Sequence, residues 1–143
     1  LTPDAPCGAD VGTRYCSPAV DNSSGAPGTI SAIGSDVLAD DQLTLVVENL
    51  PSGQFGYFLT GMTQGAFTPP ASSGVVCLSG NIGRFNQVVN IGMGPCFSME
   101  VDLSSFPVNP PRHPVAGETW HFQCWYRDGA TNNFTDAVSV TFQ

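Results

Sequence analysis

Residues 97–103 read FSMEVDL, an unbroken alternation of apolar and polar side chains. Successive side chains of a β-strand point to opposite faces, so this alternation predicts a strand with one buried and one solvated face. Antiparallel sheets that cover a core on one side have this pattern. The segment therefore predicts a protein built on antiparallel β-structure.

The same two-residue period, or a short apolar run, recurs along the rest of the chain. We expect strands at residues 29–33, 43–48, 55–59, 75–78, 87–91, 97–103, 120–128 and 138–142. Turn-forming residues separate these runs at a spacing typical of a sandwich. No stretch has a helical stripe, and 16 glycines and 12 prolines interrupt the chain too often for long helices. The prediction is an all-β, antiparallel β-sandwich of about eight strands, immunoglobulin-like or jelly-roll, with an unreadable strand order.

Length and charge narrow the class of protein further. The 143 residues fit one domain, which we place at residues 15–143 after a linker-like segment at 1–14. Four arginines, no lysine and twelve acidic residues give a formal charge of −8. Such a chain repels phosphate backbones, so nucleic acid is not an expected partner. No apolar run approaches the roughly 18 residues of a membrane span, so no span is expected.

Several phrases of the chain match a known pattern. They are YC at 15–16, QFGYFL at 54–59, CLSGNIGRF at 77–85, GETWHFQ at 117–123 and WYRD at 125–128. With shorter matches they cover most of the chain from Tyr15 on, and the chain resembles an uncharacterised β-rich domain, often C-terminal, of large secreted multidomain proteins from environmental bacteria. The resemblance implies an extracellular accessory domain and carries over no catalytic residue.

Five scattered cysteines without a CxxC pair indicate an oxidising compartment, hence a secreted or cell-surface protein with about two bridges. The resemblance implies a Cys16–Cys77 bridge. We expect Cys96 and Cys124 to form an additional pair peculiar to this chain, with Cys7 left in the linker. A local Cys7–Cys16 loop is the rival pairing. One tension concerns the second pair: Cys96 shares a strand face with polar residues, whereas Cys124 shares one with aromatic residues.

The segment 120–128 carries the strongest candidate for a binding site. Alternate residues from 120 to 126 form an aromatic face typical of a core, and the opposite face presents His121, Gln123, Trp125 and Arg127. An indole flanked by polar side chains is suited to stacking a sugar ring while its neighbours bond the hydroxyls. The alternatives are that a loop or the second sheet covers Trp125, or that Arg127 stacks on the indole.

Metal and catalytic candidates are weaker. Asp36, Asp40 and Asp41 lie in a short polar connection and form a candidate Ca²⁺ site, the alternative being a solvated turn. Glu100 and Asp102 lie about 7 Å apart on one strand face, a separation that a glycosidase pair tolerates, but paired acids are commoner on plain wet surfaces. No nucleophile elbow is present, and we do not expect an enzyme.

Two functions follow from these observations. One is a non-catalytic extracellular accessory module that binds polysaccharide through Trp125 and its neighbours. The other is a structural or adhesive β-sandwich that contacts other domains of the same chain or acts as a spacer at the cell surface. The exposure of Trp125 discriminates between them, because a covered indole removes the main argument for sugar binding.

Overall fold

The structure is a computed structural model that describes residues 11–91 and 96–143, and it contains ten strands and one short 3-10 turn, η1 (Leu38–Asp40). Its main sheet has the strand order β1 (Thr13–Tyr15), β10 (Thr131–Thr141), β9 (Thr119–Asp128), β4 (Phe55–Gly61) and β7 (Gly83–Asn90). A second sheet has the order β2 (Thr29–Gly34), β3 (Leu43–Glu48) and β8 (Cys96–Glu100), and a hairpin pairs β5 (Thr63–Phe67) with β6 (Val76–Ser79).

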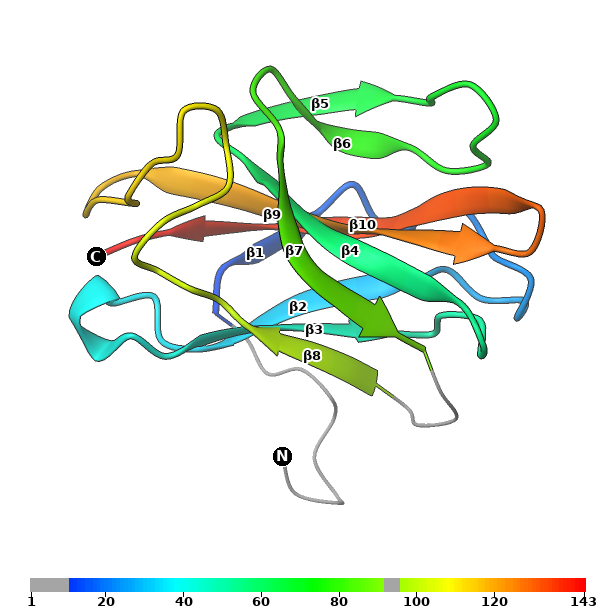
Figure 1. The fold of residues 1–143 in the computed structure, drawn as a ribbon, viewed down its shortest axis with the longest axis horizontal. Coiled ribbons are helices and arrows are strands. Elements are labelled where there is room, and N and C mark those ends of the chain that lie inside the picture. Colours follow the sequence, from blue (N-terminus) through cyan, green and yellow to red (C-terminus); the bar gives the residue numbers. More distant parts are fainter. Residues whose placement is uncertain (1–10, 92–95) are drawn as a thin grey trace.

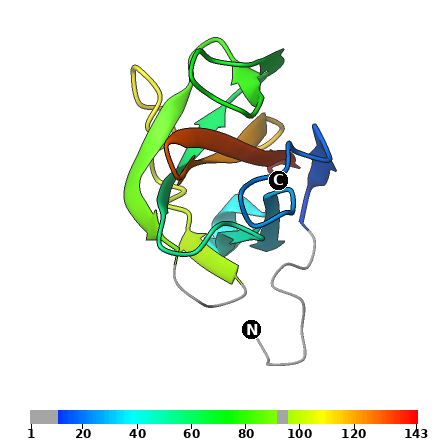
Figure 2. The same cartoon turned by 90° about the vertical axis from the view of Figure 1, so that its right-hand side faces the viewer.

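These units lie in layers. The five-stranded sheet lies in the middle, the three-stranded sheet covers one of its faces, and the β5–β6 hairpin lies on the other side (Figures 1 and 2). All pairings between these strands are antiparallel. The expected all-β antiparallel sandwich is therefore confirmed.

The hydrophobic core fills the space between the two larger sheets. Its largest fully buried members on β9 are Trp120, Phe122 and Tyr126, and Ile30 and Leu45 face them from the three-stranded sheet. Burying side chains of this size stabilises a fold by roughly 1.5–3 kcal/mol each. The two-residue period of β9 therefore places one face in the core and leaves the other on the hairpin side.

Two strands lie where the sequence analysis expected none. They are β1, whose three residues pair with β10, and β5, whose alternation is obscured by glycine and polar residues. The last residues of the linker-like segment 1–14 thus belong to the sheet, and Val11 also bonds to Ala32 through its backbone. In the described residues no helix is long and apolar enough to cross a membrane.

One predicted disulfide is confirmed and the other is wrong. Cys16, directly after β1, is bonded to Cys77 in β6, with a Cα–Cα distance of 6.4 Å. Cys124, by contrast, is a free buried thiol, whereas Cys96 is in a disulfide that does not include Cys124. The strand faces explain the error: Cys96 shares the outward face of β8 with exposed Ser98, while Cys124 points into the core. Cys7 lies outside the described residues.

Candidate functional site

The outer face of β9 is the face on which the sequence analysis placed a sugar platform. Cross-strand pairing sets Trp125 of β9 opposite Tyr57 of β4. Gly56 permits this close approach, because a Cβ there would lie 2.5 Å from the carbonyl oxygen of Trp125. The hairpin covers only part of this face, so its four predicted site residues meet different surroundings.

Gln123 is completely buried beneath the hairpin and is used internally. Its Nε2 donates to the carbonyl oxygens of Val75, 2.9 Å away, and Thr135, 2.7 Å away. Its Oε1 accepts a hydrogen bond from the backbone N–H of Cys77 at 2.9 Å. These three bonds satisfy the amide and attach β6 to the main sheet, so Gln123 has no free group for a ligand.

His121 is also taken up by the fold. It is buried, its Nδ1 lies 2.7 Å from Oγ of Ser139, and its ring meets the ring of Tyr15 edge-on. Burial lowers the pKa of His121 below its usual 6.5, because desolvation penalises the charged imidazole. The neutral ring is a packing element between β1, β9 and β10.

Trp125 and Arg127 are less covered than the other two. The Trp125 ring is half-buried and lies nearly parallel to Tyr57, with centroids 6.1 Å apart and an interplanar angle of 28°. Phe55 meets the same indole edge-on at 5.8 Å. Arg127 donates weakly from Nη2 to the carbonyl oxygen of Gly129 at 3.4 Å and does not stack on Trp125. The predicted group of four is thus divided, and only Trp125 contributes to an open site.

That open site is a groove of about 650 Å³ between the main sheet and the hairpin. Its volume is within the range of small-molecule sites in proteins. The lining is almost wholly apolar and consists of Phe55, Tyr57, Leu59, Phe67, Pro69, Val76, Ile82, Arg84, Trp125 and Phe134. We call this the hairpin groove.

Sequence reasoning missed most of the hairpin groove. Phe55 and Tyr57 alternate correctly for one strand face, but their contact with Trp125 depends on β4 lying beside β9, which the sequence does not reveal. Phe67 is on β5, where no strand was expected, and it is 60% exposed. The one signal in the sequence was an aromatic residue, Phe67, just before the turn-forming Pro69 and Pro70.

Arg84 is the single cation among the described residues that line the hairpin groove. Its guanidinium carbon lies 4.4 Å from the centroid of the Tyr57 ring, within the range of a cation–π contact. Arg84 is exposed, and among the described residues no carboxylate forms an ion pair with it. The groove therefore combines an aromatic floor with an unpaired positive charge at its edge.

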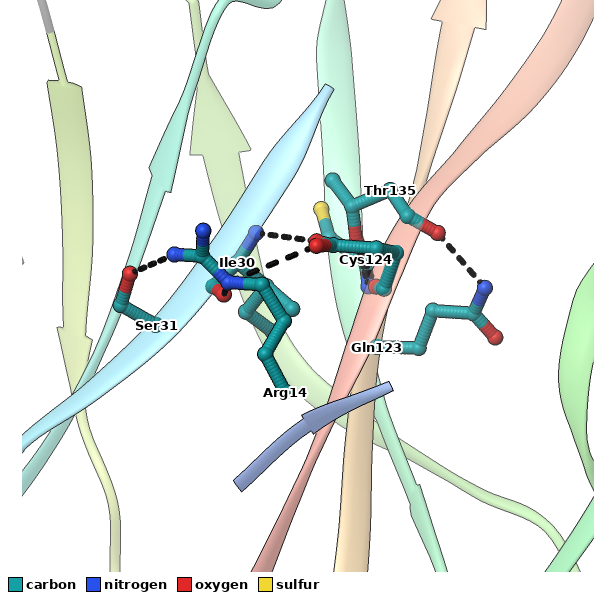
Figure 3. Close-up of polar contacts among 7 residues, drawn as sticks. Arg14, Ile30, Ser31, Gln123, Cys124 and Thr135 are labelled. Atoms are coloured by element: carbon teal, nitrogen blue, oxygen red, sulfur yellow. Dashed lines mark hydrogen bonds and ion pairs between the residues drawn. The ribbon is translucent and has the colours of Figure 1, made fainter. Parts of the chain in front are cut away.

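Apart from the hairpin groove, a cluster of polar side chains joins the two larger sheets (Figure 3). The Asp136 carboxylate is 1% exposed, accepts a 2.8 Å hydrogen bond from the Ile30 N–H, and lies 3.4 Å from Nε of Arg14. Arg14 continues to the Ile30 carbonyl and to Oγ of Ser31. Burial raises the pKa of Asp136 above its usual 3.8, although the Ile30 N–H and Arg14 oppose that shift. These bonds hold β1 and β10 of the main sheet to β2 of the second sheet, so we interpret this cluster as a structural latch between the two sheets.

The three aspartates of the predicted calcium site lie around η1. Asp40 accepts a hydrogen bond from Oγ of Ser35 at 2.6 Å, and Asp36 accepts one from the side chain of Gln143 at 3.3 Å. Over residues 11–91 and 96–143, no three His, Cys, Asp or Glu side chains are grouped so that they could hold a metal ion. Asp41 ends η1 with a left-handed backbone.

Known proteins do not assign a ligand to the hairpin groove. No family model, no curated protein and no solved structure matches this chain.

Proposed function

We propose that the chain is a non-catalytic extracellular accessory module that binds an apolar ligand in the hairpin groove. The observation that carries the proposal is the exposed aromatic surface of this groove, above all Phe67 at 60% and Phe55 at 41% exposure. Exposed apolar residues are ordinary when scattered, but gathered around a concavity they mark a binding site. Ligand binding would cover this surface and gain the hydrophobic free energy that the fold leaves unused.

The lining residues support a binding role over a catalytic one. Apart from Arg84 and the Tyr57 hydroxyl, the described lining residues offer no side chain that can act as acid, base or nucleophile. The Cys16–Cys77 disulfide supports an extracellular location, because such bridges persist in oxidising compartments. It also fixes the hairpin wall to the start of the main sheet.

Polysaccharide binding is the second candidate, and the Trp125–Tyr57 pair favours it. Two nearly parallel rings at adjacent cross-strand positions can present a surface to a sugar chain. This candidate lacks the polar partners expected for sugar hydroxyls, because Gln123 and His121 are hydrogen-bonded within the fold. We therefore rank an apolar ligand first.

The proposal can be tested with N-phenyl-1-naphthylamine, an uncharged probe whose fluorescence rises in apolar sites. Wild-type protein is expected to bind it, and Phe67→Ser is expected to weaken binding about fivefold by removing an exposed wall ring. Val115→Ser is the matched control, because Val115 is 53% exposed but outside the groove lining. Absence of probe binding by the wild-type protein, or equal weakening by both variants, would count against the groove.

Affinity electrophoresis on a panel of polysaccharides tests the second candidate. If sugars are the ligand, wild-type protein is retarded and Trp125→Ala is not, while probe binding by the wild-type protein is weak. Equal migration of the two proteins on every polysaccharide would exclude a Trp125 platform.

A further inference from the structure

We infer that the ligand of the hairpin groove is a rigid aromatic compound carrying one anionic group, and that Arg84 binds the anion. The inference rests on the proposed function, which it narrows from any apolar ligand to one of stated charge and shape. It depends on three features of the groove: the position of Arg84, the lack of an ion-pair partner for it among residues 11–91 and 96–143, and the shape of the apolar lining.

Arg84 is held in position by the ring beneath it. The residue projects from β7 beside Leu59 of β4, and its guanidinium carbon lies 4.4 Å from the Tyr57 ring centroid. A guanidinium over an aromatic face keeps its N–H groups directed outward around its edge. Those N–H groups can donate two parallel hydrogen bonds to a carboxylate or sulfonate.

Arg84 and Arg127 are the two of the four arginines for which the described residues provide no ion pair, although the chain has twelve acidic residues. Arg14 and Arg112 form ion pairs with Asp136 and Glu118. For Arg84, the described part of the chain provides neither an ion pair nor a hydrogen bond, only the Tyr57 ring. A cation at the edge of an apolar groove therefore complements an anionic ligand group.

The net charge of −8 limits which groups could make the groove prefer an anionic ligand. A protein so acidic repels small anions at long range, and an apolar groove by itself disfavours them because they must lose water. Preference for an anionic ligand can therefore come only from a local positive group. In the described part of the chain, Arg84 is the one charged residue that lines the groove.

The lining favours a flat ligand body. Tyr57 and Trp125 lie nearly parallel on the floor, and Phe67 stands on the hairpin wall. Aromatic rings gain additional stabilisation from offset-stacked and edge-to-face contacts with other rings. A rigid ring system also loses less conformational entropy on binding than a flexible alkyl chain. A volume of about 650 Å³ accommodates two or three linked rings.

Two dyes that differ by one anionic group test the inference. 1-Anilinonaphthalene-8-sulfonate carries a sulfonate, and N-phenyl-1-naphthylamine is the same ring system without it. We expect Arg84→Gln to weaken binding of the sulfonate dye about tenfold, because charge-assisted hydrogen bonds are lost. Binding of the uncharged dye is expected to change less than twofold.

Arg127→Gln is the matched control, since it removes the same charge from the outer face of β9 without altering the groove lining. Arg84→Lys should restore most of the affinity for the sulfonate dye. Equal effects of Arg84→Gln and Arg127→Gln on that dye, or equal weakening of both dyes by Arg84→Gln, would overturn the role of Arg84. Failure of the wild-type protein to bind the uncharged dye would instead overturn the proposed function.

Discussion

Replacing Arg14 by alanine should weaken the latch between the sheets in a way that depends on pH. The guanidinium donates from Nε to the Ile30 carbonyl at 3.1 Å and from Nη2 to Oγ of Ser31 at 2.6 Å. Each hydrogen bond contributes roughly 1 kcal/mol to stability. The ion pair with Asp136 adds about 1 kcal/mol, discounted because the Arg14 side chain is 44% exposed. We therefore expect Arg14→Ala to lower the free energy of unfolding by about 3 kcal/mol at pH 7.

The pH dependence follows from the direction of the Asp136 shift. In the folded protein the pKa of Asp136 is raised above 3.8 by burial, so deprotonation above that pKa destabilises the fold. Removing Arg14 raises the pKa of Asp136 further and enlarges this loss at neutral pH. Below pH 3.8 the carboxyl is protonated in both folded and unfolded chains. Arg14→Ala then lowers the free energy of unfolding only through the loss of the two hydrogen bonds of Arg14. The cost of Arg14→Ala should therefore shrink as pH falls.

Urea unfolding measures the free energy of unfolding and its pH dependence for four proteins: the wild type, Arg14→Ala, Asp136→Asn and the double variant. In the Asp136→Asn background, the pH-dependent part of the Arg14→Ala cost should disappear, because no carboxylate is left to pair. An Arg14→Ala cost that is the same at pH 7 and pH 3, or the same in both backgrounds, would refute the role assigned to the buried charge.

Three further predictions concern other groups. Burial raises the pKa of the Cys124 thiol, so iodoacetamide should leave it unmodified in the native protein and alkylate it in urea, as read by peptide mass spectrometry. Replacing Cys16 and Cys77 together by serine should lower the free energy of unfolding by about 4 kcal/mol, given their separation of 61 residues, and should weaken binding of the uncharged dye because the hairpin wall loosens. The pKa of His121 is lowered, so protonation of the unfolded chain near pH 6.5 should reduce stability as pH falls below that value. Titration of the His121 ring by NMR should show a midpoint below 6.5.

The sequence predicted those parts of the fold that local patterning determines. The alternation at 97–103 correctly places Met99, Val101 and Leu103 in the core, and the alternation in β9 correctly separates its two faces. β1 was missed because three residues are too short for a period to be visible. Its strand exists because β10 provides a partner, which is a tertiary effect.

The candidate site could be predicted only in part, because it depends on neighbours that are distant in sequence. Trp125 was identified from its own strand. The hairpin that begins at Thr63, however, buries one part of the outer face of β9 and leaves the other part open. Gln123, a candidate ligand contact, is instead hydrogen-bonded to the backbone of that hairpin segment and holds it to the main sheet. The Cys96–Cys124 error has a different origin, because the sequence already placed the two cysteines on unlike strand faces, and the structure keeps Cys124 in the core.

The pairing of β1 with β10 determines how the domain would respond to tension on its two ends. Thr13 lies opposite Ser139, so the chain enters and leaves at the same end of this ladder. Tension applied there would separate the pairs one after another, which needs little force, until Tyr15 is released. The next residue is Cys16, whose bond to Cys77 stops the peeling and transmits the load into β6. Tension on the N-terminal side would thus reach β6, one of the two strands of the hairpin, through the Cys16–Cys77 bond.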